Sequence, residues 1–256
     1  MSFSGRGINE MQQTLTITFF RYAGLANKIW GMSQMYLVRK PMRKMPGLEF
    51  FKPIGTGSGA GYSIIPDFSV YGILAVWEDI SAAEAFLKSE LFADFEQHSS
   101  EQYTVFMRPL LAKGSWSGFA NWRLVQNTNQ NAAVAVLTYA TIRTGFIIPF
   151  LRITPKVSRV SENFKGLVFS KGIGEMPVIE QATFTVWENV SDMEQFAYRK
   201  QHVEAMKLTQ QKNGFSEQLF ARFRPVKATG TFNGKNPVQE LLDKQNQREE
   251  SVNYSH

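Results

Sequence analysis

The sequence predicts an α+β fold in which two tandem copies of one unit pack sheet to sheet as a barrel within a single chain. Three observations predict it. A block of six residues around Trp77 recurs around Trp187, 110 residues later. Two further blocks recur in the same order along the chain. The predicted strands are apolar on both sides, so each sheet needs a second layer, and a chain of 256 residues with 43% hydrophobic residues is long enough to supply one.

The internal duplication rests on three pairs of segments. Val76–Ser81 matches Val186–Ser191, and Gly47–Gly55 matches Gly166–Gly174 at a separation of 119 residues. Near the end of each copy an Arg-Pro pair recurs, Arg108-Pro109 against Arg224-Pro225. The change in separation means that the first copy contains nine additional residues, which fall in the glycine-rich stretch after Gly55.

The first copy begins with a strand, a helix and two further strands. Leu15–Phe20 alternates and is rich in β-branched residues, which favours a half-buried strand. Leu25–Val38 carries Leu, Ile, Trp and Met at helical spacing. Phe50–Ile54 and Ser69–Trp77 read as strands on either side of the glycine-rich loop, which leads into a strand and so lacks the helix that a phosphate-binding loop needs.

The unit ends with a helix and a strand, and the second copy repeats the whole pattern. Ser81 with Glu84 forms a capping box that predicts a helix start, and it recurs as Ser191 with Glu194. Tyr103–Arg108 is the last strand, with Pro109 ending it. The corresponding elements of the second copy are expected at about 132–140, 145–160, 165–170, 180–187, 191–211 and 217–224.

A strand–helix–strand–strand–helix–strand unit is a ferredoxin-like fold, with both helices on one face of a four-stranded sheet. We therefore expect a first repeat with an N-terminal extension over residues 1–127 and a second repeat over 128–234. Residues 235–256 are rich in Gln, Asn and Glu and are predicted to be a disordered tail.

Composition excludes several kinds of site. The chain has no cysteine, so disulfides, thiolate metal sites and cysteine nucleophiles are excluded. Its three histidines are His98, His202 and His256, and no pair has metal-ligand spacing. The formal net charge of +6 favours an anionic partner, but no nucleic-acid motif accompanies it. No apolar run is long enough to cross a membrane and the first residues do not resemble a secretion signal, so we expect a cytoplasmic protein.

His202 differs from its counterpart in the first copy, which is Phe92 at the 110-residue separation. A position that only stabilises the fold should look alike in both copies, so this histidine is a candidate for function. An imidazole beside Tyr198, Met206 and Thr209 suits a single axial ligand to a haem. The alternative is a partly buried histidine bonded to a backbone carbonyl.

Two stretches mix basic and apolar residues. Tyr36–Pro46 interleaves four cations with large apolar side chains, and Phe146–Arg152 is its more apolar equivalent. Such a surface is typical of peripheral contact with the inner face of a membrane. The alternative is a helix that faces the core and has a solvated charged side.

Seven segments, taken in their order along the chain, resemble a known family. These segments are Trp30–Met35, Phe51–Gly59, Pro66–Tyr71, Ala140–Arg143, Lys171–Glu175, Gln181–Phe184 and His202–Met206. In this order they resemble the spheroidene monooxygenases, carotenoid oxygenases of bacterial pigment pathways that are related to the dimeric α+β barrels. The resemblance covers roughly residues 15–234.

The resemblance implies a haem-dependent monooxygenase that uses O₂ and a ferredoxin-type electron donor to insert oxygen into an apolar, carotenoid-like substrate. It implies haem b, with iron bound by His202. The remaining candidates for haem contact are Met206 and four cations that could bind the propionates, Arg143, Lys171, Arg222 and Arg224. No catalytic residue beyond the ligand is assigned.

Three alternatives remain at this point. Related barrels host several reactions, so a haem-dependent dehydratase or a peroxidase-like enzyme is one. A haem or lipid carrier without catalysis is the second, and a barrel without cofactor, in which His202 only packs, is the third. The oligomeric state is a monomer or a homodimer, since the duplication could replace the usual dimer.

Overall fold

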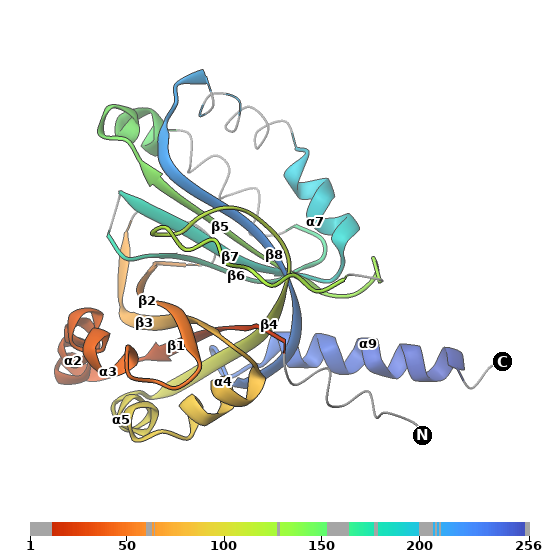
Figure 1. The fold of residues 1–256 in the computed structure, drawn as a ribbon, viewed down its shortest axis with the longest axis horizontal. Coiled ribbons are helices and arrows are strands. Elements are labelled where there is room, and N and C mark those ends of the chain that lie inside the picture. The colour runs from red at the N-terminus through yellow and green to blue at the C-terminus, as the bar shows by residue number, and fades with distance from the viewer. Residues whose placement is uncertain are drawn as a thin grey trace.

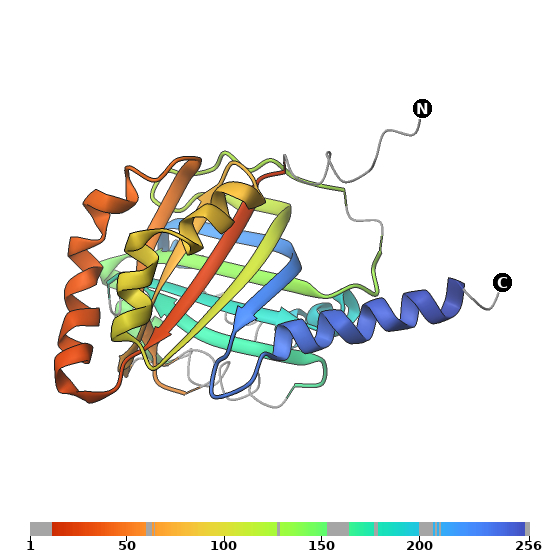
Figure 2. The ribbon, with the colours of Figure 1, turned by 90° about the horizontal axis from the view of Figure 1, so that it is seen from below.

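The fold is a closed barrel of antiparallel strands, seen in the computed structural model from two sides in Figures 1 and 2. The structure describes residues 12–59, 63, 65–126, 129–152, 164–176, 179–199, 207, 209 and 211–253. Within this part of the chain the strands follow the order β1-β3-β2-β6-β7-β5-β8-β4 around the barrel. They are β1 (Thr14–Arg21), β2 (Leu48–Gly57), β3 (Pro66–Trp77), β4 (Glu101–Gly114), β5 (Val134–Ile142), β6 (Leu167–Gly174), β7 (Glu180–Trp187) and β8 (Phe215–Gly230).

The two copies contribute four strands each, in the same internal order, and join along two seams. At the longer seam β4 pairs with β8, from Tyr103 opposite Gly230 to Gly114 opposite Leu219. At the shorter seam β2 pairs with β6, where Gly55 lies opposite Gly174. The predicted α+β barrel of two ferredoxin-like repeats is therefore confirmed, and the two sheets meet along their edges as well as across their inner faces.

Helices cover the outer face of the first sheet (Figure 1). They are α2 (Gly24–Leu37), α3 (Arg39–Met42), α4 (Ile80–Leu87) and α5 (Glu90–His98). The single helix predicted after Ser81 is in fact two, α4 and α5, because Ser89 caps α5 by accepting a hydrogen bond from the backbone N–H of Phe92. Large side chains fill the layer between helices and sheet, among them Phe20, Trp77 and Phe106, each with 0% of its surface exposed.

The capping residue predicted for this helix is wrong by two positions. Asp79, not Ser81, is the N-cap of α4, because its carboxylate accepts a hydrogen bond of 2.8 Å from the N–H of Ala82. Asn189 does the same for α7 (Val190–Ala197), with the N–H of Asp192 as donor. Both copies thus begin this helix at the same place, with a side chain that is as good a cap as serine.

The predicted end of the fourth strand is also wrong, since β4 continues through Pro109 to Gly114. Proline has no N–H to give to a neighbouring strand, but the register between β4 and β8 shifts between Pro109 and Leu111. An irregularity of this kind accommodates the missing donor without ending the strand.

The interior of the barrel is filled by apolar side chains from all eight strands, including Phe19, Phe169 and Phe184. A matching turn lies after the last strand of each copy. The first contributes Trp116, which is 1% exposed and stacks on Tyr139 with ring centroids 4.4 Å apart. The second contributes Phe232, whose ring packs against Phe19 at 5.8 Å. Aromatic rings from these turns therefore complete the packing of the interior.

The predicted disordered tail is wrong, because α9 spans Pro237–Asn253 and projects past the barrel in both views (Figures 1 and 2). Asn236 accepts a hydrogen bond from the N–H of Gln239, and Pro237 occupies the first turn, where its missing N–H costs nothing. Val238 is fully buried in the barrel core, and its N–H bonds to the Tyr103 hydroxyl. These contacts order a polar segment whose composition alone indicates disorder.

The second sheet carries fewer described helices. They are the short helix η1 (Thr144–Phe146), its continuation over residues 147–152, and α7. Much of the helices predicted at 145–160 and 191–211 lies outside the described residues. No described helix has the length and apolar character needed to span a bilayer.

Candidate functional site: the outer face of the second sheet

The site is built on the outer face of the second sheet, where the two copies differ. Their strands can be compared residue by residue because the registers correspond. Thr18 pairs with Ile73, and the corresponding pair in the second copy is Thr138 with Thr183. Two residues further along the strands, Phe20 pairs with Tyr71, and the corresponding pair is Ala140 with Gln181. The inner faces of both copies are apolar and packed. The outer faces are not alike.

Large side chains of the first copy are replaced by small or polar ones in the second. Phe20 and Ile73 become Ala140 and Thr183. On the neighbouring strands, Phe51 and Pro53 of β2 become Ser170 and Gly172 of β6, which hold the same register against β3 and β7. Aromatic rings therefore fill the layer above the first sheet. The outer face of the second sheet carries short side chains at the same positions, and we call this surface the floor.

Aromatic clusters border this floor at opposite ends of β5. At one end Trp187 packs against Phe164 and Phe196, with ring centroids 5.9 and 5.2 Å away. At the other end Phe146 meets Phe215 at 6.4 Å. Thr138 and Thr183, which share a hydrogen bond between their hydroxyls, lie between the two clusters. The face thus offers apolar borders around a small polar centre.

Arg222 is a cation on this face. It lies on β8 opposite Val136, at the position that Phe106 holds opposite Thr16 in the first copy. Its Nη1 is 3.3 Å from a carboxylate oxygen of Glu194 on α7. Its Nε is buried and has no hydrogen-bond partner in the described part of the chain. A buried guanidinium N–H without an acceptor is costly, and an anionic ligand on this face would satisfy it.

Two of the predicted haem contacts, His202 and Met206, lie outside the described residues. Both belong to the stretch between α7 and β8. The described residues on either side of that stretch adjoin the second sheet. At one end α7 contributes Phe196 to the cluster around Trp187, and at the other the N–H of Gly214 bonds to the carbonyl of Thr209 at 3.0 Å.

The other three predicted cations are spread over the molecule. Arg143 follows β5 on the second half and is exposed, with its Nε donating to the carbonyl of Phe215 at 3.2 Å. Lys171 projects into the barrel, on the same side of β6 as Phe169, and is 3% exposed. Arg224 lies two residues beyond Arg222 on β8, beside a separate cleft. The structure does not bring these four cations together.

The Lys171 ammonium already has partners inside the barrel end. It donates a hydrogen bond of 3.1 Å to the carbonyl of Gly59 and lies 3.7 Å from the carboxylate of Asp67. Burial lowers the pKa of Lys171 and Arg21 adds to this effect, against the opposing influence of Asp67. Burial acts to raise the pKa of Asp67, but hydrogen bonds from Ser69 and the charges of Lys171 and Arg21 lower it overall.

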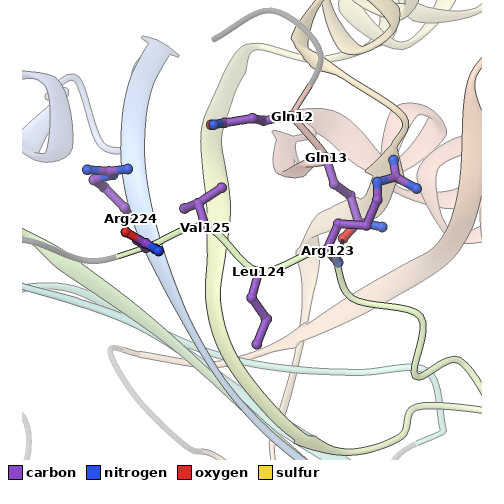
Figure 3. A pocket seen from close by; sticks show the side chains of 7 residues that line it. Gln12, Gln13, Arg123, Leu124, Val125 and Arg224 are labelled. Carbon is purple, nitrogen blue, oxygen red and sulfur yellow. Dashed lines mark hydrogen bonds between the residues drawn. The ribbon is translucent and has the colours of Figure 1, made fainter. Parts of the chain in front are cut away.

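Arg224 lines a cleft of about 450 Å³ (Figure 3). The other lining residues come from the chain before β1 and from the segment after β4, and they are Gln12, Gln13, Arg123, Leu124, Val125 and Gln126. Arg224 also lies opposite Arg108 across the β4–β8 seam, and burial together with Arg224 lowers the pKa of Arg108. The cleft is thus a polar junction between the two copies, separate from the floor of short side chains.

Sequence reasoning missed the floor itself. The signal was present, because Ala140, Thr183 and Gly172 align with large residues of the first copy once the strands are matched. Matching them requires a different separation for each strand, and only the pairing registers provide those separations.

No model of a known protein family matches the chain. Comparison with individual proteins does place it in a family. A spheroidene monooxygenase of Cereibacter sphaeroides is 33% identical over 233 residues, which are 90% of this chain and 72% of that protein. The spheroidene monooxygenase of Rhodobacter capsulatus is 30% identical over 87% of this chain and 94% of its own length.

The chain belongs to the spheroidene monooxygenase family. A third member, from Rubrivivax gelatinosus, is 32% identical over 82% of the chain and 81% of its own length. The resemblance drawn from the seven sequence segments is thereby confirmed.

Solved structures support the fold of this family member. A crystal structure of aldoxime dehydratase matches 85% of the chain with a TM-score of 0.57 at 10% identity, and covers 82% of that protein. Aldoxime dehydratase in complex with butyraldoxime matches with a TM-score of 0.56 at 7% identity, over 85% of this chain and 80% of that one. Identities this low show a common architecture only.

Proposed function

We propose that the chain is a haem-dependent monooxygenase that inserts oxygen into an apolar, carotenoid-like polyene, using O₂ and a ferredoxin-type electron donor. Membership in the spheroidene monooxygenase family supports a monooxygenase, and the names of its relatives support a polyene substrate. The observation that carries the haem is the difference between the two outer faces, where large side chains of the first copy give way to short ones in the second.

The described residues fit such a group. Haem b needs an apolar slot, donors for two carboxylates and a nitrogen ligand. The floor around Ala140 and Thr183 carries short side chains, and its aromatic borders provide apolar contact. The unpartnered Nε of Arg222 is a donor for one propionate. Arg143 follows the opposite end of β5 and is not assigned to the second. Lys171 and Arg224 are left out of this role because their side chains lie in the barrel end and the separate cleft.

Each residue has a distinct task in this proposal. His202 would bind the haem iron through a ring nitrogen, and Met206 from the same stretch would add apolar contact. Arg222, which is paired with Glu194, would hold a propionate. The Trp187 and Phe215 clusters exclude water from the edges of the slot. Bound haem would supply the iron at which O₂ is activated.

The first test is an absorption spectrum from the near ultraviolet to the red, after expression with a haem supply. We expect a Soret band in the wild type, and its shift or loss in His202→Ala. His98→Ala is the matched control, because His98 stacks on Trp30 at 4.0 Å in the first half and is outside the proposed slot. A haem-supplied wild type without a Soret band would overturn the proposal.

A second experiment separates the enzyme from a carrier and from a dehydratase. The purified holoprotein is incubated with an acyclic carotenoid, a reduced ferredoxin and isotopically labelled O₂, and products are analysed by mass spectrometry. A monooxygenase places one labelled oxygen atom in the product and reduces the other to water. Release of unchanged carotenoid, or a product without label, would contradict the proposed reaction.

A further inference from the structure

Helix α2 exposes a stripe of large apolar side chains. Leu25, Ile29, Met32 and Tyr36 are spaced three or four residues apart and are 75%, 52%, 50% and 77% exposed. This spacing places them on one face of the helix. A surface helix normally turns such a stripe toward the core. Here the stripe faces solvent.

The opposite face of α2 is already packed, so the stripe cannot turn inward. Gly31 is buried against the ring of Tyr22, where a Cβ atom would come within 2.6 Å of a ring carbon. Trp30 packs between Tyr22 and Phe95, with ring centroids 5.9 and 5.2 Å away. These contacts fix the rotation of the helix about its axis and hold the stripe outward.

The stripe lies in a strongly cationic part of the surface. Residues 24–47 contain five cations and no carboxylate. Arg39 pairs with Glu175, but Lys28, Lys40, Arg43 and Lys44 make no ion pair within the described part of the chain. Figures 1 and 2 both place α2 and α3 at the outer edge of the molecule, away from α9. The exposed apolar stripe is therefore accompanied along the chain by four cations that make no ion pair among the described residues.

We propose that α2 and α3 form a docking surface for an anionic lipid membrane. An interfacial helix inserts large apolar side chains among the lipid tails, and flanking lysines and arginines bind the headgroups. Both components are on this face. A second copy of the chain fits less well, because a symmetric dimer through α2 would place the same free cations of both copies against each other.

The test is sedimentation with vesicles of phosphatidylglycerol and phosphatidylcholine, compared with vesicles of phosphatidylcholine alone. The wild type should sediment with the anionic vesicles, and less so at high salt. The triple variant Ile29→Ser, Met32→Ser, Tyr36→Ser should bind at least tenfold more weakly. The variant Lys40→Glu, Arg43→Glu, Lys44→Glu should lose the preference for anionic vesicles. Leu124→Ser is the control, since Leu124 is 54% exposed and follows β4, outside α2 and α3.

Three results would overturn the proposal. The first is a wild type that does not sediment, and the second is a stripe variant that sediments equally well. The third is a wild-type dimer, seen by light scattering without lipid, that the stripe substitutions convert to monomers, which would assign the surface to a second copy. Because the docking surface does not involve the haem slot, His202→Ala should still bind vesicles, so this inference and the proposed function can fail separately.

Discussion

At the scale of single residues, two glutamates show how the copies hold each other. Glu217 starts the last strand of the second copy and holds the turn that ends the first. It accepts hydrogen bonds from the backbone N–H groups of Ser117 and Gly118 and from the hydroxyl of Ser115. Glu101, 116 residues earlier, accepts the equivalent bonds from the turn that ends the second copy. The turn that ends each copy is therefore hydrogen-bonded to a carboxylate of the other copy.

These bonds make the stability of the fold depend on pH at Glu217. Burial acts to raise the pKa of this carboxyl, but the hydrogen bonds from Gly118, Ser115 and Ser117 lower it overall. A lowered pKa means that the contribution is complete above the pKa of an unfolded glutamate, about 4.3, and is lost as the pH falls through the folded value.

We expect Glu217→Gln to lower the free energy of unfolding by about 1 kcal/mol near neutral pH, because the variant loses the negative charge and replaces one accepting oxygen by an NH2 group that cannot accept. The difference from the wild type should shrink as the pH falls below about 5. Urea unfolding followed by circular dichroism measures both quantities. Glu250→Gln on the exposed end of α9 is the control. A difference that grows toward acid pH would contradict the assignment.

At the scale of an element, the outer face of the second sheet differs from that of the first in having smaller side chains. The same pairing pattern supports Phe20 in one copy and Ala140 in the other, so strand geometry does not limit which side chain stands there. In the first sheet the ring of Phe20 packs against α5, with its centroid 4.8 Å from the ring centroid of Phe95. In the proposed function, the flat apolar cofactor occupies the layer that lacks this ring.

If haem binds there as proposed, restoring the bulk should prevent its binding. We expect Ala140→Phe to lower the ratio of haem to protein at least tenfold, measured from the Soret band of protein purified with a haem supply. Ala140→Ser is the matched control and should keep the band, because it adds a single atom at the same place. Full haem content in Ala140→Phe, with an unchanged far-ultraviolet circular dichroism spectrum, would place the cofactor elsewhere.

At the scale of the whole molecule, the two copies form one closed barrel. β4 pairs with β8 along most of its length, and the inner faces of both sheets share one apolar core. Separating the copies would expose unpaired strand edges on β4 and β2 and half of that core to water. We therefore expect the predicted repeats at 1–127 and 128–234 to depend on each other for folding.

We expect residues 1–126 and 127–256, produced as separate chains, to lack a cooperative thermal transition when each is alone. Produced together, they should copurify as a complex of one copy each and recover the near-ultraviolet circular dichroism of the intact chain. The intact protein carried through the same procedure is the control. A cooperative transition in either fragment alone would show that a copy is an independent domain.

Several local features could be predicted from sequence because they depend on near neighbours. Alternating β-branched residues identify β1, and helical spacing identifies α2. The predictions of the helix cap and of the strand end were less accurate, because another residue within two positions can take the same role or a distant strand can extend the pairing. Asp79 competes with Ser81 for the helix start, and the seam with β8 carries β4 past Pro109.

The sequence by itself determined the duplication, the fold class and the family, since these follow from the order of residues along the chain. Three features were decided only by the tertiary structure. They are the order of α9, the floor around Ala140 and the outward stripe on α2. Each depends on contacts between segments far apart in sequence. Val238 packs into the barrel core, and Ala140 stands at the position that Phe20 holds in the other copy. The contact of Tyr22 with Gly31 fixes the rotation of α2. Spacing along a chain indicates which residues share a face, and packing decides which way that face points.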